Sequence, residues 1–527
     1  FRSALERMNE YPDFVFTSAA ASYYEWIEQN DPAMFAQIQA RVKEGRWRIV
    51  GGFWIQPDCN IPSGESFARQ ALYAQRYFQE KFGVTARTGY NVDSFGHSGS
   101  LPKILRMCGM ENYVYMRPGL HEKSYPAWTF AWQSPEGEQV TAYRIPFEYC
   151  TWGNALGEHI ARCAEEIRDE NGMMCFYGVG NHGGGPTREN LDTLAALNGK
   201  NGVELRLSSP DQYFESLSRD NLPVVNGDLL HHASGCYAAH SGVKRWNRLA
   251  ENRLVTAEKW SSAAHVLLGK PYPREAYCKA WKKVLFNQFH DILAGTCIRE
   301  AYDDTREDYG YALSVGAERM NDAQQAIAGQ IETPFTEGAF TYVAFNPQGF
   351  PAKAPVALEV QRYKTDMRLV DSRGREVSWQ LTDGSAAAMG RKRLHFVADV
   401  PAMGWHTYRM LPLEGAPVER TMDASPVLEN DFVRAEFSAE AGLCSLFLKS
   451  AQTELLREPV QALVIDDPSD TWSHAVLRFD RVEAAMTLQS LRVAQDGPVL
   501  KTIRAVYAHG ESALTADFTL YRDLPQI

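Results

Sequence analysis

The N-terminal part of the chain alternates helix and strand signals, and this rhythm limits the possible folds. Asp31 can cap a helix that begins at Pro32, and Ser63 can cap a second helix that ends before Gly83. A βαβ order of this kind implies mainly parallel strands joined by right-handed crossovers, in a sheet or a barrel. The predicted strands cover residues 47–50, 88–92, 113–116, 140–145, 173–177 and 204–207.

Several polar side chains directly follow these predicted strands. In such folds functional side chains gather where strands end and loops begin, so these residues are expected to meet at one edge. The alternative is a set of unrelated loop residues, but their agreement in position favours a shared site. The residues are Asp93, Arg117, the segment 147–149, Asn181 and His182.

The sequence pattern changes twice after this part of the chain. Between residues 243 and 330 it has the helical period, with few Gly or Pro interruptions, which predicts a three-helix bundle whose aromatic residues are mostly core. After Pro334 short alternating runs separated by turn residues predict an all-β sandwich. The expected domains are a β/α domain over residues 1–235, a helical bundle over 236–332 and a β-sandwich over 333–527.

Composition excludes several classes of protein. A net charge of -11 argues against nucleic-acid binding and against a basic membrane-surface patch. No apolar run reaches the 18 residues that a membrane span would require. The nine cysteines include no C-x-x-C pair, which favours reduced thiols in a cytoplasmic protein over a disulfide framework. A neutral partner such as a sugar is compatible with this charge.

Asp93 is the first candidate for chemistry. It is followed three residues later by Gly96, and a carboxylate at a strand end beside a tight glycine turn can be held rigidly at a cleft. A nucleophile or a metal ligand requires such fixed lone pairs. The alternative is an aspartate that caps a helix or closes a turn, which spacing alone favours.

His290 and Asp291 form the second candidate, and the glycine-rich segment 178–187 forms the third. A histidine beside an acid can ligate a metal through one ring nitrogen, although a single histidine among apolar neighbours is more often a core residue. The segment 178–187 lacks the Lys-Ser/Thr of a P-loop, so we expect its backbone to approach a substrate closely. Three further histidines are expected to be surface or interdomain residues: His231, His232 and His240.

Taken together, these segments resemble glycoside hydrolase family 38, the zinc-dependent retaining α-mannosidases, and most closely its bacterial and cytosolic branch. The resemblance extends over nearly the whole chain in the same order, and it depends on the set of motifs more than on any one of them. The similar segments are residues 45–47, 51–54, 57–58, 62–66, 93–96, 101–102, 183–187, 244–245, 247–248, 290–291, 295–296 and 467–468, together with Trp472.

The resemblance implies a sevenfold β/α barrel, then a three-helix bundle, then β-sandwich domains. It implies that Asp93 is both the catalytic nucleophile and a zinc ligand, and that His290 is a second ligand. The implied reaction is double displacement, in which Asp93 attacks the anomeric carbon and water then releases α-mannose. The expected substrate contacts are Asp291, Arg117, Tyr149, Phe95, Trp54 and His182.

Two departures from the family pattern shape these expectations. Family members begin the barrel with a strand that carries a His-x-Asp ligand pair, and no such segment lies near Phe1. We therefore expect a chain that is truncated at both ends and carries two of four zinc ligands. Asn181 stands where related enzymes often carry an aspartate, so the acid/base is unassigned, with His182 or another acid as options.

Two alternatives to a mannosidase remain at this point. One is a zinc-dependent hydrolase of the polysaccharide deacetylase type, and the other is a sugar-binding protein that does not cut its ligand. The expected partner is an α-mannoside carbohydrate. The sequence leaves open whether the protein forms a homo-oligomer.

Overall fold

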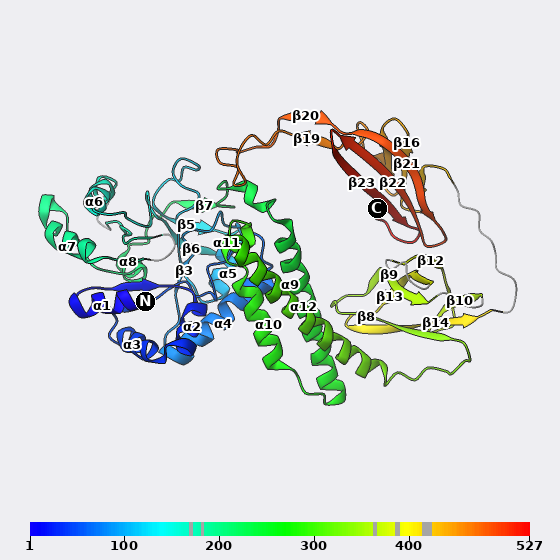
Figure 1. Ribbon diagram of the computed structural model, residues 1–527, viewed down its shortest axis with the longest axis horizontal. Helices are drawn as coiled ribbons and strands as arrows, with labels where there is room; N and C mark the ends of the chain where they lie inside the picture. The colour runs from blue at the N-terminus through cyan, green and yellow to red at the C-terminus, as the bar shows by residue number, and fades with distance from the viewer. Residues whose placement is uncertain (168–171, 181–183, 362–365, 385–389, 414–423) are drawn as a thin grey trace. The chain divides into compact units, whose positions relative to one another are not determined.

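The computed structural model falls into two compact units (Figure 1). The first unit comprises Phe1–Glu258, Tyr272–Arg319 and Pro468–Leu477. The second comprises Lys259–Pro271, Met320–Asp467 and Arg478–Ile527. The structure describes residues 1–167, 172–180, 184–361, 366–384, 390–413 and 424–527.

A five-stranded sheet in the order β3-β4-β6-β5-β7 forms the centre of the first unit. Its strands are β3 (Thr88–Tyr90), β4 (Asn112–Tyr115), β5 (Thr129–Gln133), β6 (Gln139–Arg144) and β7 (Val224–Asn226). Strands β3, β4 and β6 run parallel, whereas β5 is antiparallel to β6. A second, two-stranded parallel sheet joins β1 (Phe16–Ser18) to β2 (Trp47–Ile49).

The helices of this α/β part begin where their capping residues predict. Asp31 accepts a hydrogen bond from the Met34 backbone N–H at 3.0 Å, and Ser63 accepts one from the Ser66 N–H at 3.2 Å, which confirms both predicted caps. The helices are α1 (Arg2–Glu10), α2 (Ala21–Asn30), α3 (Pro32–Lys43), α4 (Gly64–Phe82), α5 (Leu101–Met107), α6 (Leu156–Glu165), α7 (Arg188–Leu197) and α8 (Pro210–Ser216).

Two predicted strands are wrong, and three strands of this unit, β1, β5 and β7, escaped prediction. Residues 173–177 and 204–207 lie in the described part of the chain but form no strand. A strand needs a partner as well as an apolar run: the Leu205 N–H bonds to the Asn198 side chain instead of a neighbouring strand. The unpredicted strand β5 turns back antiparallel on β6, so the sheet is mixed. The sevenfold barrel therefore stays a prediction.

The helical region contains three long helices and one short helix. They are α9 (Ser241–Leu268), α10 (Arg274–Phe286), α11 (His290–Ala294) and α12 (Arg299–Ala328), drawn in green in Figure 1. Glu251 of α9, which is 2% exposed, accepts hydrogen bonds from the Ser63 N–H, the Ser66 hydroxyl and the Gln288 amide. This buried carboxylate joins α9 to the start of α4 and to the segment just before α11.

Replacement of Glu251 by alanine should lower the free energy of unfolding of the first unit by about 3 kcal/mol, because the Ser63 N–H, the Ser66 hydroxyl and the Gln288 amide each lose a hydrogen bond to this buried carboxylate. Urea unfolding followed by circular dichroism measures this loss. The control is Glu318→Ala on α12, where the exposed side chain pairs with its neighbour Arg319, and it should cost less than about 0.5 kcal/mol. Equal effects of the two substitutions would contradict the role of Glu251.

The second unit is dominated by antiparallel sheets, as the sequence predicts for this region. The sheet orders are β11-β10-β14-β8, β12-β13-β9, β15-β16-β17-β18, β19-β20 and β21-β22-β23. The strands are β8 (Phe340–Asn346), β9 (Ala352–Gln361), β10 (Met367–Asp371), β11 (Glu376–Val377), β12 (Trp379–Asp383), β13 (Arg391–Val400), β14 (Gly404–Pro412), β15 (Val427–Glu429), β16 (Val433–Ser438), β17 (Gly442–Leu448), β18 (Thr453–Glu454), β19 (Leu463–Ile465), β20 (Val482–Ala485), β21 (Thr487–Asp496), β22 (Leu500–His509) and β23 (Ser512–Tyr521). Among the described helices of the chain, none is both long and apolar enough to cross a membrane.

Candidate active site

Asp93 and Arg117 meet because the strands that precede them are in register. Tyr90 of β3 lies opposite Val114 of β4. Asp93 and Arg117 each come three residues after these paired positions. At this edge the Arg117 Nε donates a hydrogen bond to Asp93 Oδ1 at 2.5 Å. The side chains of Asp93 and Arg117 are 25% and 29% exposed, so the ion pair is open to a ligand on one side.

Tyr149 reaches the same carboxylate from the loop after β6, which runs parallel to β4. Its hydroxyl donates to Asp93 Oδ2 at 3.3 Å. Burial, and next the negative charge of Asp93, raise the pKa of Tyr149, so this hydroxyl keeps its proton and acts as a donor. A Cβ atom at Gly180 would lie 3.4 Å from the Tyr149 ring and 2.5 Å from the Cys150 Cβ, so the glycine-rich loop packs directly behind Tyr149.

His290 approaches Asp93 from the first residue of α11. Its place is fixed by pairing between two distant segments: the Asp58 N–H donates to the Gln288 carbonyl at 2.8 Å, and the His290 N–H donates to the Gln56 carbonyl at 3.3 Å. The His290 Nδ1 lies 3.0 Å from the same Gln56 oxygen. A carbonyl can only accept, so Nδ1 carries the proton and the Nε2 lone pair is left for a metal or an acid.

The pair formed by Asp93 and His290 suits two ligands of one metal ion. Asp93 Oδ2 and His290 Nε2 are 3.8 Å apart. Zinc bonds of about 2.0–2.2 Å in a tetrahedral arrangement bring an oxygen and a nitrogen ligand to a similar separation. The hydrogen bond from Nδ1 to the Gln56 carbonyl is the outer support that ligating histidines usually have.

Two residues that sequence analysis did not assign to the site hold Arg117 from behind. The Arg117 NH1 donates to His232 Nε2 at 3.1 Å, and because a guanidinium only donates, this nitrogen accepts. The His232 Nδ1–H then donates to Glu122 Oε1 at 2.5 Å. Burial alone would raise the pKa of Glu122, but the hydrogen bonds from His232 and the Gly119 N–H bring it below its usual value, so Glu122 is a carboxylate.

The predicted surface position is wrong for His232, which is 5% exposed, although His231 and His240 are exposed as expected. The reason is the ion-paired network itself. Arg117 provides a donor and Glu122 provides an acceptor, and the two hydrogen bonds compensate the burial of the imidazole. The only sign of this site in the sequence was the pair of adjacent histidines, His231 and His232, and the pair does not indicate which of the two is buried.

His97 fixes the backbone of Arg117. Its Nε2–H donates to the Arg117 carbonyl at 2.9 Å, and its Nδ1 accepts from the Tyr113 hydroxyl at 2.8 Å. Burial lowers the pKa of His97 to about 3, so the ring stays neutral and keeps this arrangement. The only sign in the sequence that His97 supports the site was its position four residues after Asp93.

The two predicted aromatic walls are both buried. Phe95 is 1% exposed, and its ring centroid lies 6.0 Å from that of His290 and 4.7 Å from that of Trp472. Trp54 is 3% exposed beneath the Lys282 ammonium, 4.7 Å from the ring centroid. Their contact with a sugar stays a prediction, whereas Trp472 is half-buried beside Phe95 and presents more of its ring.

The remaining predicted contacts are Asp291 and His182. Asp291, half-buried in the first turn of α11, accepts a hydrogen bond from the Thr296 hydroxyl at 2.8 Å. This bond orients the carboxylate of Asp291, which directly follows His290 in the sequence. Contact between Asp291 and a substrate stays a prediction. Asn181 and His182 lie outside the described residues.

Comparison with protein families matches the chain to two adjacent models. Residues 1–238 match the family described as glycosyl hydrolases family 38 N-terminal domain. Residues 231–327 match the family described as alpha mannosidase middle domain. Together the two models extend from Phe1 through most of α12.

Curated relatives and solved structures agree with these matches. The chain is 28% identical over 491 residues to human Alpha-mannosidase 2C1, covering 89% of this chain and 44% of the relative. It is 33% identical over 313 residues to Alpha-mannosidase G of Dictyostelium discoideum, covering 58% of this chain and 28% of the relative. The chain thus spans less than half the length of these relatives.

A solved structure supports the fold. The crystal structure of an alpha-mannosidase from Enterococcus faecalis V583 superposes with a TM-score of 0.79 at 19% sequence identity. The superposition covers 96% of this chain and 64% of the other. At this identity the likeness shows a common fold.

Proposed function

Because this chain belongs to glycosyl hydrolase family 38, we propose that it carries the nucleophile and part of the metal site of an α-mannosidase. The observation that supports this most strongly is the convergence of Arg117, Tyr149 and His290 on the single carboxylate of Asp93. The proposed activity is hydrolysis of terminal α-mannosides from glycans or oligosaccharides, with retention of configuration.

Asp93 is the proposed nucleophile. It attacks the anomeric carbon while the bond to the leaving oxygen breaks and a general acid donates a proton to that oxygen. Water then attacks the same carbon and displaces the Asp93 carboxylate, so two inversions give net retention. Arg117 and Tyr149 hold the carboxylate in one orientation, which keeps the attacking lone pair on its line of approach.

Zn²⁺ is the proposed cofactor, with Asp93 and His290 among its ligands. When bound, the ion would supply a Lewis-acid position for vicinal sugar hydroxyls. The ring of His290 is already oriented for this by the Gln56 carbonyl. We include in this proposal the detailed architecture that the family resemblance implies, namely a sevenfold barrel and a three-helix bundle.

An aryl α-mannoside assay with the full-length protein and added zinc tests the proposal. We expect release of the aryl group from the α-mannoside and much slower release from the matched β-mannoside, because attack by Asp93 requires one configuration at the anomeric carbon. Binding of mannose without turnover would instead indicate a sugar-binding protein. Release of acetate from an acetylated glycan would indicate a deacetylase.

His232 is a positioning residue for Arg117, so His232→Ala should lower kcat/KM for the aryl α-mannoside about 10²-fold, mainly through kcat. His232→Gln should recover part of this loss, because a glutamine amide can accept from Arg117 and donate to Glu122. The control is His509→Ala at the exposed end of β22, which should leave both constants unchanged. Failure of glutamine to recover more activity than alanine would contradict the positioning role.

A further inference from the structure

A second group of metal-type ligands lies outside the candidate active site. His159 and Cys163 are one turn apart on α6, and Cys175 comes from the segment that follows. One ligand atom from each of the three residues lies within 4.8 Å of the other two, and the His159 Nε2 is 4.0 Å from the Cys163 Sγ. His159 and Cys163 are buried, and Cys175 is half-buried.

The types of these residues select a class of ion. Two sulfur ligands and an imidazole form a set that favours zinc and similar thiolate-binding metals over calcium or magnesium, which prefer oxygen. The i, i+4 spacing on a helix places His159 and Cys163 on the same face. In a tetrahedral zinc site neighbouring N and S ligands are about 3.5–3.8 Å apart, so shifts of up to about 1 Å would bring the three ligands to an ion.

We propose that His159, Cys163 and Cys175 bind one thiolate-preferring divalent ion, of which Zn²⁺ is the reference, with a water molecule in the fourth position. Binding replaces the protons of the two thiols and breaks no covalent bond between heavy atoms. This inference does not depend on the proposed mannosidase activity, because none of the three residues contacts Asp93 or His290 in the described structure.

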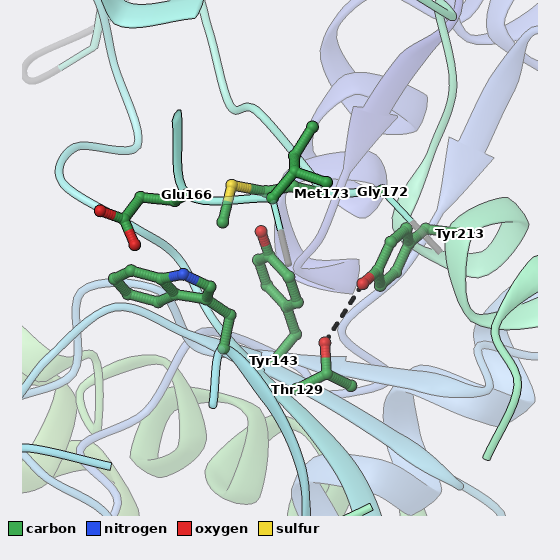
Figure 2. Close-up of a pocket in the computed structure, with 8 residues that line it drawn as sticks. Thr129, Tyr143, Glu166, Gly172, Met173 and Tyr213 are labelled. Carbon is green, nitrogen blue, oxygen red and sulfur yellow. Dashed lines mark hydrogen bonds between the residues drawn. The ribbon is translucent and has the colours of Figure 1, made fainter. Parts of the chain in front are cut away.

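The surroundings of Cys175 are fixed in the way that a metal ligand requires. The Tyr143 hydroxyl donates to the Met174 carbonyl at 2.8 Å, which holds the backbone next to Cys175. Figure 2 shows Tyr143 pointing toward the Gly172–Met173 segment, in a cavity of about 50 Å³ that Glu166 also lines. Glu166 directly follows α6, and Met173, which also lines the cavity, is two residues before Cys175.

The position of the proposed site suggests a structural role for the ion. Cys175 is three residues before Gly178, where the glycine-rich loop begins, and α6 follows the segment that carries Tyr149. The Thr151 N–H already donates to the Gly178 carbonyl at 2.8 Å. An ion shared by α6 and Cys175 would fix the start of this loop relative to Tyr149, as a structural zinc does in other folds.

Cobalt substitution tests the proposal with a signature that the Asp93 site cannot give. Co²⁺ bound to thiolates has a near-ultraviolet sulfur-to-metal charge-transfer band, whereas carboxylate and imidazole ligands give none. We expect this band in the full chain, its loss in Cys163→Ser and in Cys175→Ser, and its retention in Cys108→Ser, a half-buried thiol on the same unit. Absence of the band, or its retention in both of the first two variants, would overturn the proposal.

A second measurement on the unmutated protein covers the case in which a variant fails to fold. The reduced protein is treated with an alkylating reagent with and without Zn²⁺, and the labelled peptides are identified by mass spectrometry. Zinc should slow labelling of Cys163 and Cys175 by about tenfold or more and leave Cys108 unchanged, because coordination removes the free thiolate. Equal labelling rates with and without zinc would overturn the proposal.

Discussion

Replacement of Asp93 by asparagine should reduce kcat/KM for an aryl α-mannoside by about 10⁴-fold or more while the protein remains folded. An amide oxygen is a poor nucleophile and a poor leaving group, so both the formation and the hydrolysis of the glycosyl-enzyme intermediate would slow. Asparagine keeps an oxygen that can accept the Arg117 Nε–H, so the local contacts are largely conserved. The loss is therefore chemical and not one of stability.

Initial rates at several substrate concentrations, combined with a thermal unfolding curve, measure this effect. The matched control is Asp383→Asn, an identical change at an exposed carboxylate at the end of β12, which should alter the rate by less than a factor of about two. Turnover by Asp93→Asn within tenfold of the unmodified protein would remove Asp93 from the role of nucleophile.

Replacement of His290 by alanine should reduce the zinc content of the Asp93 site and lower kcat/KM by at least about 10²-fold. His290 is 3% exposed, and its Nε2 lies 3.8 Å from Asp93 Oδ2. A site without His290 keeps the carboxylate of Asp93 but binds zinc with lower affinity. Added zinc should recover part of the activity, since a weakened site fills at higher metal concentration.

The measurement of zinc content has to distinguish the site at Asp93 from the proposed site at Cys163. We would measure zinc per chain after dialysis in a Cys163→Ser background, where an ion at the thiol site is absent. His265→Ala, at an exposed position on α9, is the control and should retain both zinc and activity. An unchanged zinc content in His290→Ala would contradict the assignment of His290 as a ligand.

The features that the sequence predicts well are local or follow from strand register. Asp31 and Ser63 bond to backbone groups three residues away, so their capping roles can be read from a short window. Asp93 and Arg117 follow adjacent parallel strands, and parallel strands bring their carboxyl ends to one edge. The meeting of these two side chains could therefore be expected before the structure.

The features that escaped prediction depend on contacts between distant segments. His232 and Glu122 are 110 residues apart, and nothing near either residue indicates its partner. The pairing that places His290 involves Gln56, 234 residues away. Trp472 lies within the β region of the sequence but belongs to the first unit, where it packs on Phe95. Only the resemblance to a family indicated the proposed role of His290, since its apolar neighbours in the sequence favoured a core residue.

The most direct test of the central claim is to trap the intermediate on the nucleophile. A fluorinated α-mannosyl fluoride, which forms the glycosyl-enzyme ester faster than water can hydrolyse it, would be incubated with the full-length protein, and the labelled peptide would be sequenced by mass spectrometry. The account predicts one sugar bound as an ester to Asp93, and α-mannose as the first product from an unmodified substrate. A label on another residue, or β-mannose as the first product, would contradict it.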